Sequence, residues 1–430
     1  MKKSIIRTFV VAALGLSALS LTGCEVKAKE YIPGAPVKVG LICLHGSQST
    51  YDKNFIDSLD AAVKKLGAKV DGSPIIKTDV AESKACFNAA KDLVKQGCNV
   101  IFADSFGHEK YMLEAAKKWP EVQFCHATGT QALTAGKSNY HNAFASIYEG
   151  RYLAGYAAGL KLQKMVAAGQ VKSSQMRNGN IVLGYIGAFQ YAEVISGYTS
   201  WYLGVKEVVP NVVMDVTFTK SWYDFNAEKA GAQTLINNSG AALISQHADS
   251  MGAPGECESK GVPNVSYNVS TADQCKTTYV SMSKIDWAPY YESVVTAVYQ
   301  GGQIENEVDA NYTGNLLTGS VKYDVADAAD KLVVQGIEAE LKAGTRKVFD
   351  CSKFTVTINA EKKINTGAKV DANGHLTSYT ADVQDMGDYV PETEAVKTAG
   401  GITYFDESAK RSAPYFDLTI DGITLLNSGF

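Results

Sequence analysis

The chain alternates between short apolar runs and longer segments whose apolar residues recur every three or four positions. The first run, residues 38–44, is almost wholly apolar, which is typical of a strand buried on both faces. Apolar residues then fall at Phe55, Leu59, Ala62, Val63 and Leu66, which predicts a helix. A glycine directly follows that segment, as is usual at a helix C-terminus.

The same alternation continues through most of the chain. The patterns predict strands at residues 99–103, 122–125, 143–147, 181–186, 212–219, 242–245 and 264–268. They predict helices at residues 81–97, 109–119, 150–165, 194–208, 225–237, 286–299 and 331–343, with a short helix near Glu256. Strands that alternate with helices predict an α/β protein with parallel sheets covered by helices on both faces.

Two successive series of this kind, of similar size, predict two doubly wound parallel-sheet lobes. We expect the first lobe to contain residues 38–148 and about 280–315, and the second to contain residues 149–279 and about 316–351. Helix 150–165 is rich in alanine and glycine, so we expect it to lie close against a neighbour. In residues 352–430 predicted strands and helices no longer alternate. We expect these residues to form a C-terminal extension of short strands and turns, with a clear turn at residues 371–374.

Ligands of open α/β sheets bind beyond the carboxyl ends of the strands. In a two-lobed protein these ends would face each other across a cleft. The segments that follow the predicted strands there are residues 45–55, 104–108, 148–149, 188–191, 220–224, 246–250 and 268–270. We therefore expect recognition residues in these segments.

The N-terminus has the parts of a lipoprotein signal in the required order. A basic start is followed by an apolar run at residues 9–21 and then by Leu21-Thr-Gly-Cys24. We expect cleavage before Cys24, a lipid on its thiol, and a tether over residues 24–37. The mature protein would then be anchored to the outer side of a cell membrane.

Composition narrows the class of partner. The net charge is −4 and hydrophobic residues make up 46% of the chain, which argues against nucleic-acid binding and against widespread disorder. The cysteines are scattered singly without a CxxC pair, so we expect no metal site, and nothing indicates a cofactor. Cys257 and Cys275 are the pair that we consider for a disulfide.

The predicted loops carry a series of short motifs in a recognisable order. They are Asp52-Lys-Asn-Phe55, Ser105-Phe-Gly-His108, Ala115-Ala-Lys-Lys-Trp-Pro120, Tyr148-Glu-Gly-Arg-Tyr-Leu-Ala-Gly155, Ser221-Trp-Tyr-Asp224 and Gln246-His-Ala-Asp-Ser250. In these motifs the chain resembles the basic membrane protein family of bacterial lipoproteins, over roughly residues 37–351. That family includes purine and purine-nucleoside receptors of ABC transporters.

The resemblance implies a type I periplasmic-binding-protein fold, in which the chain crosses the hinge three times. It also implies a small-molecule ligand, an ABC transporter permease as partner, and binding rather than catalysis. The segment 246–250 suits the purine-binding branch. The chain departs from the family where Ile56 follows Phe55, because the family usually has asparagine there.

We predict that Phe55 and Trp222, from different lobes, sandwich a flat purine. Asp52 and Asp249 would accept its N–H groups, supported by Gln190, Gln246 and Ser250. The rest of the predicted ligand-binding set is Phe106, Glu149, Phe189, Asn268 and Lys284.

Each of these assignments has a plainer alternative. Phe55 could anchor its helix to the sheet, and Lys284 could be an ordinary solvated lysine. Asp52, Glu149 and Asp249 could cap helices, and for Asp224 we favour capping. His108 and His247 are interpreted as surface or loop residues rather than as metal or acid–base groups.

Three other functions fit parts of the pattern. A pentose receptor of the same fold would use similar hydrogen-bonding and aromatic residues. An anchored nucleoside hydrolase could pair Asp52 with Asp249, although the chain has no nucleophile elbow, metal-ligand set or phosphate loop. A surface adhesin would account for the C-terminal extension but not for the two-lobed body.

Overall fold

The computed structural model describes residues 26–304, 311–383 and 393–427. The proposed signal peptide and Cys24 lie outside these residues. Among the residues that the structure describes, helices are either too short or too polar to cross a membrane.

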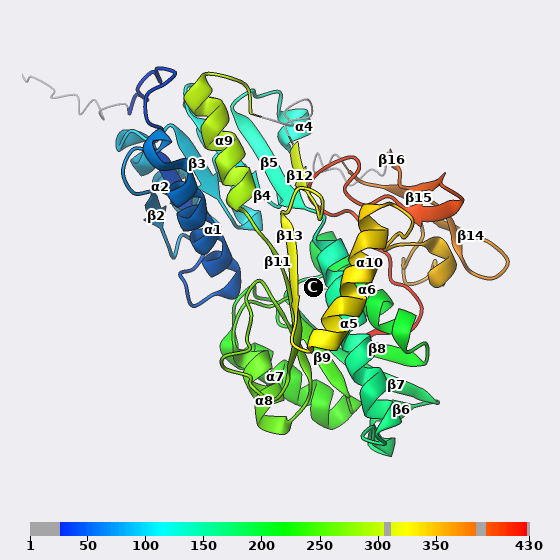
Figure 1. The fold of residues 1–430 in the computed structure, drawn as a ribbon. Coiled ribbons are helices and arrows are strands. Elements are labelled where there is room, and N and C mark those ends of the chain that lie inside the picture. Colours follow the sequence, from blue (N-terminus) through cyan, green and yellow to red (C-terminus); the bar gives the residue numbers. More distant parts are fainter. Residues whose placement is uncertain (1–25, 305–310, 384–392, 428–430) are drawn as a thin grey trace, which may run out of the picture.

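The first lobe is built on a parallel sheet of strand order β12-β5-β4-β3-β1-β2 (Figure 1). Its strands are short and apolar, and Val39, Leu41 and Ile42 of β1 are almost completely buried. The strands are β1 (Val39–Ile42), β2 (Ile75–Lys77), β3 (Val100–Ala103), β4 (Gln123–Ala127), β5 (Tyr140–Ala145) and β12 (Asn311–Gly314). The helices are α1 (Thr50–Leu66), α2 (Lys84–Lys95), α3 (Glu109–Lys118), α4 (Ala132–Ala135) and α9 (Ala288–Gln300).

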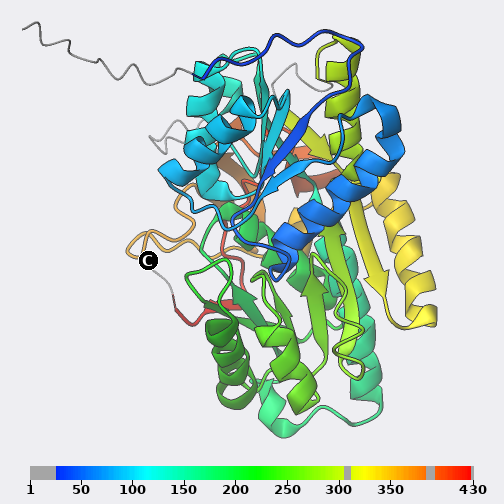
Figure 2. The same ribbon diagram turned by 90° about the vertical axis from the view of Figure 1, so that its left-hand side faces the viewer.

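The second lobe lies below the first in Figures 1 and 2 and has the strand order β13-β11-β10-β9-β7-β8-β19. Pairings along this order are parallel except that of β13 with β11. The strands are β7 (Asn180–Gly187), β8 (Val212–Phe218), β9 (Leu243–Gln246), β10 (Asn264–Tyr267), β11 (Tyr279–Ile285), β13 (Val321–Val325) and β19 (Ile423–Leu425), with β6 (Met176–Arg177) beside β7. The helices are α5 (Ile147–Ala167), α6 (Ala192–Val208), α7 (Phe225–Thr234), α8 (Gly252–Lys260) and α10 (Ala328–Lys342).

The chain passes between the lobes at three places that lie together. They follow β5, β11 and β12, and backbone hydrogen bonds join them: Ser146 N–H donates to Gly314 O at 2.7 Å, and Asp286 N–H donates to Ser320 O at 2.8 Å. The return to the first lobe comes at Asp286. This is later than the predicted boundary near residue 280, because β11 pairs with β10 and β13 in the second sheet.

Helix α5 approaches α6 very closely, as its small residues predict. A Cβ on Gly155 would lie 2.1 Å from the carbonyl oxygen of Trp201, and one on Gly204 would lie 2.2 Å from that of Tyr152. Only glycine permits this spacing at the two positions, and it lets Trp201 and Tyr198 pack fully buried.

The C-terminal extension packs on the second lobe (orange to red in Figure 1). It contains two small antiparallel sheets, formed by β14 (Ala368–Val370), β15 (Leu376–Ala381) and β16 (Thr393–Glu394), and by β17 (Val396–Ala399) and β18 (Ile402–Phe405). The predicted turn before β15 is present, with Gly374 N–H donating to Asp371 O at 3.1 Å. The last strand, β19, was not predicted as part of a lobe, and it extends the second-lobe sheet beside β8.

Cys257 and Cys275 do not form the disulfide that the sequence led us to consider. Both are free, buried thiols. Cys257 lies on α8, where its sulfur accepts a hydrogen bond from Asn264 Nδ2 at 3.7 Å.

Candidate ligand-binding site

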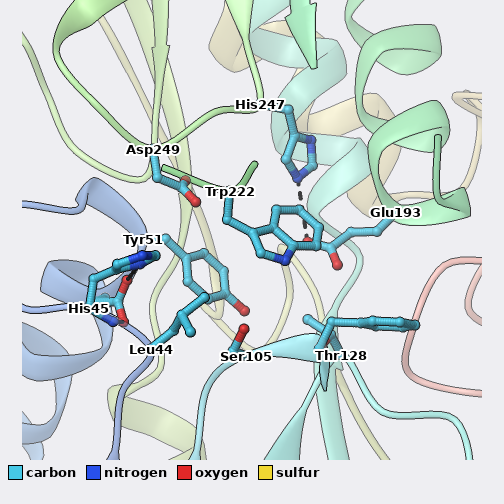
Figure 3. Close-up of a pocket in the computed structure, with 11 residues that line it drawn as sticks. Leu44, His45, Tyr51, Ser105, Thr128, Glu193, Trp222, His247 and Asp249 are labelled. Atoms are coloured by element: carbon cyan, nitrogen blue, oxygen red, sulfur yellow. Dashed lines mark hydrogen bonds and ion pairs between the residues drawn. The ribbon is translucent and has the colours of Figure 1, made fainter. Parts of the chain in front are cut away.

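A cavity lies between the lobes, where the carboxyl ends of their strands face each other (Figure 3). About 360 Å³ in and around it is not filled by protein atoms, a figure that includes space open to solvent. Residues of both lobes line it, namely Leu44, His45, Tyr51, Asp52, Ser105, Phe106 and Thr128 from the first and Glu193, Trp222, His247 and Asp249 from the second.

The start of α1 positions the first-lobe wall. Ser49 caps this helix by accepting a hydrogen bond from Asp52 N–H at 3.2 Å. Tyr51 therefore lies in the first turn, and its hydroxyl donates to Asp104 O at 2.9 Å. This bond holds the Tyr51 ring at the cavity, where Figure 3 shows it near Trp222.

Two carboxyl groups beneath this wall, those of Asp52 and Asp104, have pKa values shifted in opposite directions. Burial raises the pKa of Asp104 well above its usual value, and the nearby Asp52 raises it further. Burial also acts to raise the pKa of Asp52, but hydrogen bonds from His45 and Ser49 outweigh it and lower that pKa overall. Asp52 is thus the ionised partner, and His45 N–H donates to its Oδ1 at 2.8 Å.

Cys43, Asp52 and Asp104 form a compact group in which one ligand atom of each lies within 4.8 Å of the others. Burial also raises the pKa of the Cys43 thiol. The thiol and the Asp104 carboxyl both favour their protonated forms, so a cation would have to displace their protons in order to bind. We therefore assign no metal to this group.

The second-lobe wall combines one aromatic ring with three buried ionisable groups. Trp222 follows β8, and its carbonyl oxygen accepts a hydrogen bond from Asp249 N–H at 3.0 Å. Burial raises the pKa of Glu193 to about 8, and burial raises that of Asp249 well above its usual value. At neutral pH Glu193 therefore keeps its proton and can donate a hydrogen bond as well as accept one, and burial favours the protonated form of Asp249 in the same way.

His247 lies in the loop after β9, which fits its interpretation as a surface or loop residue, but its side chain is buried. Its Nε2 lies 3.4 Å from Glu193 Oε1. Burial holds its pKa well below the usual value, and the cation of Arg151 adds to this effect. His247 is therefore a neutral ring at the cavity. His108 is likewise buried, with Nε2 2.8 Å from Val80 O.

Arg151 is fully buried next to this wall. Its guanidinium lies 3.5 Å from the centre of the Tyr267 ring, and Nη1 donates to Gln246 O at 3.0 Å. Its Nε and Nη2 atoms have no hydrogen-bond partner. A buried cation is thus held mainly by a ring face and one carbonyl oxygen.

The lobes touch each other around the cavity. Thr50 N–H donates to Asp249 O at 2.8 Å across the cleft. Phe106 stacks on Tyr191 with ring centroids 5.0 Å apart, and His45 packs on Tyr223 at 5.4 Å. These contacts describe a closed arrangement of the two lobes.

Four of the residues predicted from the sequence line the cavity: Asp52, Phe106, Trp222 and Asp249. Gln190 lines an adjoining cavity. Asn268 lies behind the wall, where its amide donates to Asp249 Oδ1 at 3.4 Å. Phe189 supports Trp222 from the side, with ring centroids 5.1 Å apart.

The predicted role of Phe55 is wrong. Its ring is buried in the core and stacks on Trp287 with centroids 4.4 Å apart, so it does not line the cavity. Tyr51, one helical turn earlier, lines the cavity instead. The plainer alternative, a residue that anchors α1, is the one that the structure supports.

Four other predicted residues also lie away from the cavity wall. Gln246 accepts a hydrogen bond from Asn264 at 3.0 Å, and Ser250 N–H donates to Glu228 at 3.0 Å. Lys284 lies on β11 opposite Lys322, and Glu149 accepts from Leu316 N–H at 3.2 Å near the hinge. Asp224 caps α7, as we favoured, by accepting from Ala227 N–H.

Seven residues line the cavity without having been predicted from the sequence as ligand-binding residues: Leu44, His45, Tyr51, Ser105, Thr128, Glu193 and His247. Most of them lie in or beside the segments that follow predicted strands, so position alone could have found them. Thr128 carries a second signal in the structure, because its φ of 65° is unusual for a β-branched residue.

The fold and this cavity define a two-lobed protein that binds a small molecule between its lobes. Residues 40–350 match the family of PnrA-like ABC transporter substrate-binding proteins, and the chain belongs to this family. It is therefore a substrate-binding protein of an ABC transporter, a class that works outside the cytoplasm.

The similar proteins agree with this class. A purine-binding protein of Brucella abortus is 29% identical, over 75% of this chain and 85% of its own length. A protein of Haloferax volcanii named as a candidate ABC transporter glucose-binding protein is 28% identical, over 51% of this chain and 50% of its own. The solute-binding protein of an ABC transporter from Conexibacter woesei has the same fold, with a TM-score of 0.55, 18% identity and coverage of 72% and 98% of the two chains.

Proposed function

We propose that this protein captures a purine base or purine nucleoside between its lobes and delivers it to an ABC transporter permease. The observation that carries this proposal is the pair of aromatic rings, Tyr51 from the first lobe and Trp222 from the second, on the wall of one cavity (Figure 3). A flat heterocycle between them would hold both lobes in the closed arrangement. The purine-binding relative in Brucella abortus supports the same ligand class.

The carboxyl groups around the rings of Tyr51 and Trp222 can pair with the hydrogen-bond donors and acceptors on the edge of a purine. Asp52 is ionised and accepts N–H donors, whereas protonated Glu193 and Asp249 can donate to ring nitrogens or to a carbonyl oxygen. Stacking does not select between bases, because every base has a flat face. Selectivity therefore rests on these carboxyl groups.

Calorimetric titration with adenine, guanine, hypoxanthine, their nucleosides, ribose and glucose tests the proposal. We expect a purine or its nucleoside to bind most tightly. Trp222→Ala and Tyr51→Ala should each weaken binding about tenfold to a hundredfold, since stacking on a base contributes about 1–3 kcal/mol per ring. Tyr51→Phe is the matched control, because it keeps the ring and loses only the hydroxyl bond to Asp104.

A sugar receptor is the second candidate, favoured by the likeness of half the chain to the Haloferax volcanii protein. Tight binding of glucose, ribose or xylose with no binding of purines would replace the purine proposal by this one. A hydrolase would consume the nucleoside, so recovery of intact nucleoside after incubation supports a purely binding role.

We also propose that Cys24 carries a lipid that anchors the protein to the outer side of the membrane. The support is the order of basic start, apolar run and Leu21-Thr-Gly-Cys24 in the sequence. Cys24→Ser should release the protein from washed membranes, whereas a variant that stays bound would contradict the anchor.

A further inference from the structure

A second cavity adjoins the first one. About 1020 Å³ in and around it is not filled by protein atoms, a figure that includes space open to solvent. Phe106, Thr128 and Glu193 line both cavities, so the two share a wall. A ligand whose flat ring lies between Tyr51 and Trp222 has this second space next to it.

The far side of the second cavity comes from the C-terminal extension. Its lining residues there are Asp382, Arg411, Ala413, Pro414, Tyr415 and Asp417. The lobes supply Thr130, Gln190, Tyr191 and Ala192 in addition to the shared residues. The family match ends at residue 350, so this wall lies outside the part of the chain that the family describes.

The extension is fixed firmly to the second lobe. Phe416 stacks on Phe349 with centroids 4.4 Å apart. Met214 N–H donates to Gly422 O at 2.8 Å, and Asn427 bonds both backbone groups of Phe218 at 2.8 and 2.9 Å. The extension therefore presents a preformed wall that moves with the second lobe.

One polar group at the junction of the two cavities lacks a partner. Thr128 is buried, and its hydroxyl oxygen has no hydrogen-bond partner among the residues that the structure describes. Its backbone is held at a φ of 65°, a conformation that costs about 1–3 kcal/mol for such a residue. A strained residue with an unsatisfied hydroxyl on a shared cavity wall indicates a ligand contact.

The carboxyl groups that the extension adds to the second cavity disfavour an anionic ligand. They belong to Asp382 and Asp417, whereas Glu193 keeps its proton at neutral pH. The guanidinium of Arg411 donates to four backbone carbonyl oxygens within the extension, those of Asp382, Val383, Ala413 and Pro414. Carboxylates accept hydrogen bonds from hydroxyl groups and repel phosphate, while the rings of Tyr191 and Tyr415 offer apolar surface.

We propose that the C-terminal extension forms a subsite for a neutral, hydroxylated substituent on the purine, such as the sugar of a nucleoside. The inference rests on the proposed function, since it assumes that the base occupies the first cavity. It makes the extension a determinant of specificity: it favours nucleosides over free bases and rejects nucleotides.

Calorimetry with one base, its nucleoside and its 5′-nucleotide tests the subsite. We expect the nucleoside to bind most tightly. Asp417→Asn should weaken nucleoside binding about three- to tenfold, because a neutral amide accepts a hydroxyl more weakly than a carboxylate does, and leave base binding unchanged. Asparagine at 417 can still accept the hydroxyl of Tyr379, which now lies 2.5 Å from Asp417, so the local fold is kept.

Asp421→Asn is the matched control. This residue lies on the same extension and also accepts one hydroxyl, that of Thr355 at 2.7 Å, but it does not line the cavity. It should change neither affinity.

Equal affinities for base and nucleoside, with Asp417→Asn silent, would overturn the subsite and leave the purine receptor standing. An equal loss of base and nucleoside affinity in Asp417→Asn would also overturn it, because the effect would then be structural. If neither ligand binds the wild-type protein, the proposed function itself fails.

Discussion

At the scale of single residues, the site depends on ionisable groups that the fold has removed from water. Glu193 and Asp249 are almost completely buried, and burial raises the pKa of each. His247 beside them is neutral, because burial and Arg151 both lower its pKa. The cavity therefore offers hydrogen-bond donors at neutral pH where the sequence alone indicates carboxylate acceptors.

Glu193→Gln tests this protonation state. The pKa of Glu193 is about 8 in the folded protein against an ordinary value of 4.5, so the folded protein keeps a proton that the unfolded chain releases. The free energy of unfolding should therefore fall as pH rises from about 4.5 to about 8, by at most about 1.4 kcal/mol per pH unit for this group. Glutamine cannot titrate, so the free energy of unfolding of the variant should rise relative to that of the wild type over that pH range.

Denaturant titration of both proteins between pH 4 and pH 9 measures this difference. Comparing the two proteins removes the contributions of the other buried carboxyl groups. A difference that is independent of pH would show that Glu193 keeps its ordinary pKa.

At the scale of elements, the pattern of small residues in α5 decides how closely two helices pack. The backbone of α6 occupies the space where a side chain at Gly155 would lie. Helix α10 also contains a glycine, Gly336, but a Cβ there meets no atom within 4 Å. The same residue type thus has opposite consequences in two helices.

Gly155→Ala should destabilise the protein by about 1–3 kcal/mol, because the added methyl group forces α5 away from α6. Gly336→Ala should stabilise it by about 0.5–1 kcal/mol, since alanine favours the helix and meets no obstacle. Thermal and denaturant unfolding of the two variants gives the comparison. Similar effects of the two substitutions would show that α5 and α6 are not in the contact described.

At the scale of the whole molecule, the contacts across the cleft describe two lobes held together around a cavity. These contacts include the stack of Phe106 on Tyr191 and the bond from Thr50 to Asp249. Without ligand, these contacts between the lobes compete with hydration of the surfaces that an open cleft exposes. Ligand contacts made with both lobes shift the population to the closed form.

Small-angle scattering should therefore show a smaller radius of gyration at saturating purine or nucleoside than without it. Trp222→Ala is the useful comparison, because it should need more ligand for the same change. An unchanged radius at saturation in the wild type would contradict closure by the ligand.

The sequence by itself determined the α/β class, most elements and the loops that hold the site. The spacing of apolar residues and the residues that end helices are local properties of the chain. They can therefore be recognised in the sequence without knowledge of the fold. Trp222 and Asp249 were found for this reason, since each follows a predicted strand. The resemblance to the family added the expectation that the chain crosses between the lobes three times.

Tertiary structure alone decided which residues in those loops line the cavity. Phe55 and Tyr51 lie one turn apart on α1, and only the position of Trp287, far along the chain, makes the first a core residue and leaves the second at the cavity. The place of β19 beside β8 and the wall that residues 411–417 add to the second cavity depend on equally distant partners. Such pairings follow from packing between distant segments, and no local pattern encodes them.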